Sequence, residues 1–167
     1  KKDYKGIFLE LSKESAMIYN DAKKIALEHY KKNKSTISCY DIQKEIYKNY
    51  KDFKLSSNSK IAVIQQFDKA RRGYFKSLKS YKKDPSKFTG IPTFPNKDKN
   101  INCIYFKKTS ITFKGGYIRL SLSRGNEPIK IKWNVNLPIP IFAILSYNKK
   151  YGWKFSFVLQ FNIKENN

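Results

Sequence analysis

The sequence has few of the residues that build metal centres or hydrolytic active sites. It contains two cysteines, Cys39 and Cys103, and a single histidine, His29, without the spacing of a zinc site. It also has no Walker-type phosphate loop and no grouping of serine or cysteine with histidine. We therefore expect free thiols, no metal or other cofactor, and no catalytic centre within this chain.

Acidic residues are scarce in comparison with basic ones. The chain has 13 Asp and Glu against 35 Lys and Arg, which gives a formal net charge of +22. Residues 101–167 hold only Glu127 and Glu165, which are too few carboxylates to hold a Mg²⁺ ion. The surplus of positive charge extends over both halves of the chain, so it predicts a basic surface and a polyanionic partner, RNA or DNA.

Long apolar runs are also missing. No segment has the length of a transmembrane helix, and no signal peptide or lipidation motif is present. The sequence therefore predicts no membrane partner and a cytoplasmic location. The chain nevertheless has the means to fold, because 40% of its residues are hydrophobic and 16% are aromatic, unlike a disordered segment.

The spacing of the apolar residues changes from helical to strand-like near residue 95. From Ser12 to Tyr81 it predicts three helices, with starts at Ser12, at Ser38 and in the stretch 56–59. Ser38 is followed by an acidic residue three positions on, which is typical of a capped helix start.

Residues 101–161 alternate between apolar and polar side chains, which predicts several short strands. Gly115 and Gly116 indicate a hairpin turn, and the apolar stretch 7–9 could supply one more strand. We predict an α+β fold in which a small antiparallel β-barrel (1–10 and 101–167) carries a three-helix module (11–81) inserted after its first strand. Residues 82–100, rich in proline, form an extended crossover.

Cationic side chains recur on the third predicted helix at alternating steps of four and three residues. This spacing places them on one face, opposite the apolar stripe. Only Asp68 and Asp84 lie near enough to offset the charge. We interpret this face as one that follows phosphate groups; the alternative is a simply solvated face. The residues predicted to contact the nucleic-acid backbone are Lys23 and Lys24 of the first helix, together with Gln65, Lys69, Arg72, Lys76, Lys79 and Lys83 of the third.

Other polar and aromatic residues are suited to contact bases. Amide and hydroxyl groups near the predicted helix starts could meet base edges, or could equally be caps and solvated side chains. Four aromatic residues around the end of the third helix could stack on unpaired bases, or could pack the crossover against the domain. These four are Tyr74, Tyr81, Phe88 and Phe94.

Several short motifs, in their order along the chain, resemble the N-terminal half of the RNA-guided endonucleases TnpB and Cas12f. They are Tyr19-Asn20-Asp21-Ala22, Leu55-Ser56-Ser57, Lys69-Ala70, Gly73-Tyr74-Phe75-Lys76, Lys87-Phe88-Thr89-Gly90-Ile91-Pro92, and the strand residues Ile111, Ile118 and Leu120. The resemblance implies a wedge-type barrel interrupted by a helical recognition module. Such a protein holds a guide RNA and double-stranded target DNA and reads a short motif beside the target.

The resemblance also implies which residues read that motif and what lies outside the chain. The positions carried over for motif reading are Tyr40, Gln43, Ser57, Asn58, Ile61, Lys107 and Lys108. Because the chain begins at Lys1 without Met and stops at Asn167, we expect it to be a fragment. A RuvC-like nuclease with Mg²⁺, and a zinc-binding segment, would follow it in a parent protein of the prokaryotic cytoplasm or nucleoid.

Three functions stay open at this point. The first is target recognition within an RNA-guided DNA endonuclease, with one protein chain or two on each guide. The second is an RNA-guided regulator whose nuclease is lost. The third is a basic RNA- or DNA-binding module that needs no guide.

Overall fold

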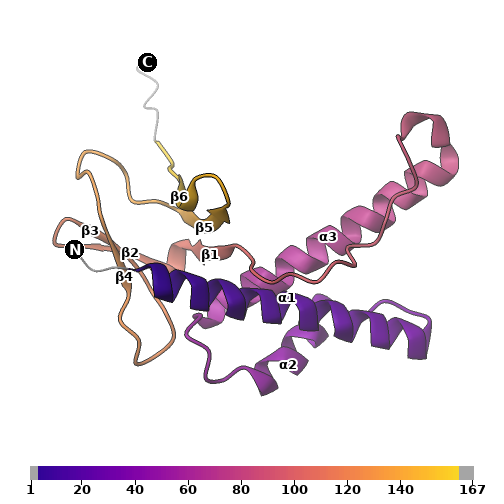
Figure 1. The fold of residues 1–167 in the computed structure, drawn as a ribbon, viewed down its shortest axis with the longest axis horizontal. Coiled ribbons are helices and arrows are strands. Elements are labelled where there is room, and N and C mark those ends of the chain that lie inside the picture. The colour runs from indigo at the N-terminus through magenta and orange to yellow at the C-terminus, as the bar shows by residue number, and fades with distance from the viewer. Residues whose placement is uncertain (1–3, 162–167) are drawn as a thin grey trace, which may run out of the picture.

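The computed structural model describes residues 4–161, in which helices come first and strands second (Figure 1). This order confirms the predicted α+β class. The helices are α1 (Lys5–Asn33), α2 (Cys39–Asn49) and α3 (Ser57–Lys83). The strands are β1 (Ile104–Lys107), β2 (Ile111–Lys114), β3 (Tyr117–Leu120), β4 (Ile129–Lys132), β5 (Phe142–Asn148) and β6 (Gly152–Val158), with 3₁₀ turns η1 (Pro85–Lys87) and η2 (Lys108–Ser110).

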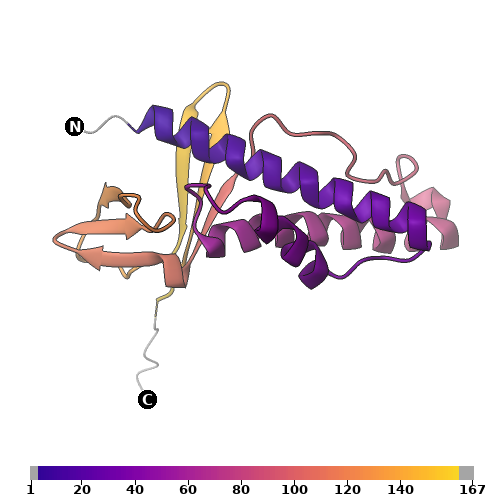
Figure 2. The ribbon, with the colours of Figure 1, turned by 90° about the horizontal axis from the view of Figure 1, so that it is seen from below.

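The two long helices α1 and α3 lie side by side, and α2 packs against both (Figures 1 and 2). The rings of Tyr19 on α1 and Phe67 on α3 meet edge to face at 5.6 Å between centroids. Ile42 and Ile46 of α2 are buried in the same core. Each fully buried side chain of this size contributes about 1.5–3 kcal/mol of burial free energy, so these residues hold the helices together.

The starts of α2 and α3 are confirmed as predicted. Ser38 caps α2, and its Oγ accepts a hydrogen bond from the backbone N–H of Asp41 at 3.1 Å. Ser56 caps α3 in the same way, with the N–H of Ser59 at 3.3 Å. Both caps satisfy a backbone donor that the helix itself leaves unpaired.

The start of α1 was predicted wrongly. Residues 7–9 belong to α1 and not to a strand, and Ser12 lies inside the helix instead of capping it. The Ser12 and Ser15 hydroxyls donate to the backbone oxygens of Asn102 (2.6 Å) and Cys103 (2.8 Å). These serines therefore fix the segment before β1 to the helix. In the sequence alone, a serine with this role cannot be told from one that caps a helix.

The six strands form two three-stranded antiparallel sheets, ordered β1-β5-β6 and β2-β3-β4. The strands of one sheet run across those of the other in Figure 2, and η2 carries the chain from β1 to β2. Trp133, just after β4, meets Phe157 of β6 at 4.9 Å between ring centroids. Within residues 4–161 the strands thus make two packed sheets, and not the closed barrel that we predicted.

Between α3 and β1, the crossover runs back along α1 (Figure 2). The side-chain amide of Asn20 bonds both the N–H and the C=O of Lys99, each at 2.9 Å. The Lys23 ammonium donates to the backbone oxygen of Asn96 at 2.8 Å and pairs with Asp98. The crossover is therefore tied to α1 by polar contacts along its second half.

Candidate nucleic-acid interface

The predicted cationic side chains of α3 are exposed together on one face of the helix. Ile64 and Phe67, on the opposite side, are fully buried. We call the exposed set the α3 cationic face: Gln65, Lys69, Arg72, Lys76, Lys79 and Lys83. The structure thus places all six predicted residues where a ligand can reach them.

The second half of α3 extends away from the other helices (Figure 1). Arg71 is the last buried residue of this helix, which lies entirely within the described part of the chain. Phe75, beyond Arg71, is 40% exposed. Lys76, Lys79 and Lys83 make no side-chain hydrogen bond or ion pair within residues 4–161. The outer half of the face therefore keeps its full positive charge.

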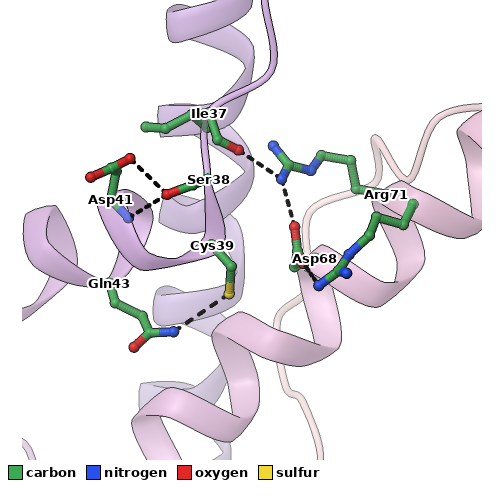
Figure 3. A network of polar contacts seen from close by, with 8 residues as sticks. Ile37, Ser38, Cys39, Asp41, Gln43, Asp68 and Arg71 are labelled. Atoms are coloured by element: carbon green, nitrogen blue, oxygen red, sulfur yellow. Dashed lines mark hydrogen bonds and ion pairs between the residues drawn. The ribbon is translucent and has the colours of Figure 1, made fainter.

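A buried ion pair on α3 links the middle of this helix to the segment just before α2 (Figure 3). Asp68 is 2% exposed and pairs with the buried Arg71 at 2.5 Å and with the exposed Arg72. Arg71 also donates to the backbone oxygen of Ile37 at 2.9 Å. Asp68 therefore has two cations beside it, and the 75% exposed Arg72 side chain keeps donors available to solvent.

The start of α3 lies beside the end of β1 and the η2 turn. Asn58 donates to the Thr109 hydroxyl at 2.9 Å, and the Lys107 ammonium donates to the Gln65 side-chain oxygen at 2.9 Å. The structure thus brings together two pairs of residues that lie 51 and 42 positions apart in the sequence. Lys107 and the exposed Lys108 extend the α3 cationic face toward the sheets.

The remaining residues predicted to read a motif lie on two helices. Tyr40 is 64% exposed on α2, with the Lys44 ammonium 4.5 Å from its ring centroid. Gln43 is half-buried, and its amide donates to the Cys39 sulfur at 3.5 Å (Figure 3). On α3, Ser57 is exposed and Ile61 is half-buried. Their role in reading a DNA motif stays a prediction.

The four aromatic residues predicted to stack on bases contact other rings of the chain. Phe94 meets Phe67 at 6.5 Å and Tyr74 at 5.4 Å, and Tyr81 meets Phe88 at 5.7 Å between centroids. These contacts hold the crossover against α3, which is the packing role left open by the sequence. All four rings remain half-buried, so each keeps part of its surface in solvent.

The two lysines predicted on α1 differ from each other. Lys24 is exposed, whereas Lys23 is 7% exposed and engaged with the crossover. The structure gives Lys23 a structural contact, and Lys24 alone of the two faces solvent. Neither residue belongs to the α3 cationic face.

Several acidic residues make structural contacts. Glu14, for example, accepts the backbone N–H groups of Lys54 and Leu55, both at 2.9 Å. Burial raises the pKa of this carboxyl, and the two hydrogen bonds oppose that rise. No group of three or more His, Cys, Asp and Glu side chains within residues 4–161 is arranged to hold a metal ion, and Cys39 and Cys103 are free thiols.

The sequence did not reveal a second basic surface, on the β2-β3-β4 sheet. Cross-strand pairing places Arg119 between Thr112 and Lys130, and Tyr117 between Lys114 and Lys132. These rows alternate with buried rows such as Ile111, Leu120 and Ile129. The alternation of apolar and charged residues along each strand is visible in the sequence. Only the pairing register, however, shows that the cations of different strands share one face.

Comparison with models of known protein families finds no match to this chain, and no curated protein matches it. Within residues 4–161, no helix has the length and apolarity needed to cross a membrane.

Proposed function

We propose that this chain binds nucleic acid through its α3 cationic face. The observation that carries this proposal is a row of exposed cations whose outer members have no counter-charge within residues 4–161. Like charges three or four residues apart on a helix cost about 0.2–0.5 kcal/mol per pair, so a polyanion that neutralises them stabilises the face. A row of this kind fits phosphate groups better than it fits an isolated acidic side chain.

The length of the face supports a polymer as the ligand. Gln65 and Lys83 are 18 residues apart, which corresponds to about 27 Å along an α-helix. Phosphates follow one another at about 3.4 Å along the axis of each DNA strand, so this distance covers about eight of them. Lys107 and Lys108 continue the row beyond Gln65.

We further propose that the chain is the RNA- and DNA-binding part of an RNA-guided DNA endonuclease of the TnpB and Cas12f type. The order of the sequence motifs supports this proposal, and so does the combination of three helices with small antiparallel sheets. In this proposal the sheets correspond to the wedge part, and the helices to the recognition module. A guide RNA and double-stranded target DNA would then be the partners, and cleavage would need residues outside this chain.

The experiment that tests the guided function is recovery of bound RNA. The parent protein is expressed in cells and purified at moderate salt, and the RNA that remains bound is sequenced. One dominant structured RNA with a variable end supports a guided protein. A broad mixture that follows cellular RNA abundance contradicts the guided proposal and leaves a guide-independent binder, whereas no bound RNA or DNA contradicts both proposals.

A further inference from the structure

A polar pocket lies at one end of the β2-β3-β4 sheet, apart from the α3 cationic face. It has a volume of about 270 Å³ and opens to solvent. Strands β2 and β3 form one wall, and the turn between β3 and β4 forms the other. The polar side chains that line it are Thr112, Arg119, Ser121, Ser123, Arg124 and Asn126.

Arg119 stands in this pocket with an unpaired donor. Its Nε is buried, and no acceptor within residues 4–161 lies in hydrogen-bond reach. A buried donor without a partner costs about 1–3 kcal/mol, so the fold gains when an acceptor from outside reaches this atom. An oxygen of a ligand or of water would satisfy this donor.

The turn that forms the other wall is held in place by hydrogen bonds. The N–H of Ser123 donates to the backbone oxygen of Lys54 at 2.7 Å, and the Asn126 amide donates to the Ser123 hydroxyl at 3.0 Å. Gly125 has φ +85°, a left-handed conformation that side chains rarely adopt. The turn is thus shaped before any ligand arrives, and it carries the exposed Arg124 into the pocket lining.

Most of the charges around the pocket are positive. Lys130 lies directly across from Arg119 in the sheet, and Lys114 and Lys132 belong to the neighbouring row of the same face. Glu127, the acid nearest in the sequence, has an interaction of its own. A neutral or cationic ligand would leave these charges uncompensated, whereas an oxyanion offsets them.

We propose that this pocket binds a phosphate group. Two guanidinium groups can approach a tetrahedral oxyanion from the two walls, and an arginine side chain bonds such an anion through two parallel N–H donors. The hydroxyl groups of the lining supply further donors. This site is independent of the α3 cationic face and of any guide RNA, because it rests on different residues in the other half of the chain.

The phosphate can belong to a nucleic-acid backbone, to the end of a nucleic acid, or to a free ion. All three present the same oxygens to Arg119. They are distinguished by competition between inorganic phosphate, an oligonucleotide with a 5′-phosphate, and the same oligonucleotide without it.

The test follows the Arg119 Nε–H by ¹H–¹⁵N NMR in the 167-residue chain, with inorganic phosphate as the first probe. We expect this signal and the backbone amides of residues 121–126 to shift saturably. In Arg119→Gln we expect about tenfold weaker binding or more, because one charge-assisted, two-point contact is lost. Lys149→Gln, in the distant β5-β6 turn, removes the same charge and should bind phosphate as the unmodified chain does.

The outcomes distinguish a specific phosphate site from non-specific electrostatic attraction. Shifts that do not saturate, or equal binding by Arg119→Gln and the unmodified chain, would overturn the proposal. If both oligonucleotides displace inorganic phosphate, the site binds backbone phosphates. If only the 5′-phosphorylated oligonucleotide displaces it, the site binds a terminal phosphate. If neither does, the site binds a free phosphate ion. Variants of the α3 cationic face serve as a separate control, because their loss of nucleic-acid binding should leave these shifts unchanged.

Discussion

Neutralising three lysines of the α3 cationic face should flatten the salt dependence of nucleic-acid binding. We choose Lys69, Lys76 and Lys79 because none of them makes a side-chain hydrogen bond or ion pair within residues 4–161. Arg72 is left in place because it pairs with the buried Asp68. Replacement by glutamine keeps the helix propensity nearly unchanged, so the fold should not respond.

The magnitude follows from counterion release. Each phosphate contact contributes about −0.9 to the slope of log Kobs against log salt on duplex DNA, and about −0.7 on a single strand. Losing three contacts should therefore make the slope shallower by about 2.7 or about 2.1. On a duplex at about 0.1 M salt, this corresponds to an affinity loss of about 500-fold.

Fluorescence anisotropy with a labelled duplex and a labelled single strand, at several salt concentrations, measures both quantities. A matched control replaces Lys149, Lys150 and Lys154, which are exposed on the β5-β6 hairpin. An unchanged slope in the folded α3 variant would refute the α3 cationic face. An equal loss in the control would show that net charge alone attracts the ligand.

Further predictions concern the contacts that hold the site in place. Glu14→Ala should lower the unfolding free energy by about 2–4 kcal/mol in a denaturant titration, because two backbone N–H groups, one buried and one partly buried, lose their acceptor. Arg71→Met should lower the unfolding free energy by about 3 kcal/mol and leave the salt slope of binding unchanged. Arg72→Gln should lower the unfolding free energy by less than about 1 kcal/mol and weaken nucleic-acid binding. Equal effects of the two changes on stability and on binding would contradict this difference. Burial lowers the pKa of Lys60 and Lys99 from 10.5, so the unfolded chain binds their protons more tightly than the folded one. The unfolding free energy should therefore rise with pH as the folded ammonium groups lose their protons, up to about pH 10, where tyrosines of the unfolded chain begin to ionise. A double Met variant of these two lysines should lose that rise.

The features that the sequence predicted correctly depend on local geometry. The caps of α2 and α3 involve residues three positions apart, and the turn at Gly115 and Gly116 joins adjacent strands. The α3 cationic face follows from helical spacing alone once a helix is assigned. Each of these depends on residues close together in the chain, so a single sequence contains the information.

The features that were missed depend on distant contacts. Ser12 lies inside α1 because its hydroxyl meets the backbone oxygen of Asn102, ninety positions away in the sequence. Two sheets and a closed barrel require the same alternation in every strand, and only the strand pairing of the whole β half distinguishes them. The pocket around Arg119 likewise exists only because the turn after β3 folds back beside β2.

The internal contacts of the lysines distinguish those that build the fold from those available to a ligand. Lys23 and Lys60 donate to backbone oxygens, Lys54 pairs with Glu10, and Lys99 bonds Asn102. These lysines hold the crossover and the α2–α3 connection in place, so part of the positive charge is used inside the protein. The cations without an internal hydrogen bond or ion pair within residues 4–161 include those on the outer half of α3 and those around Arg119. Net charge predicts a polyanionic partner, and this separation of structural from unpaired cations supports the two binding sites that we propose.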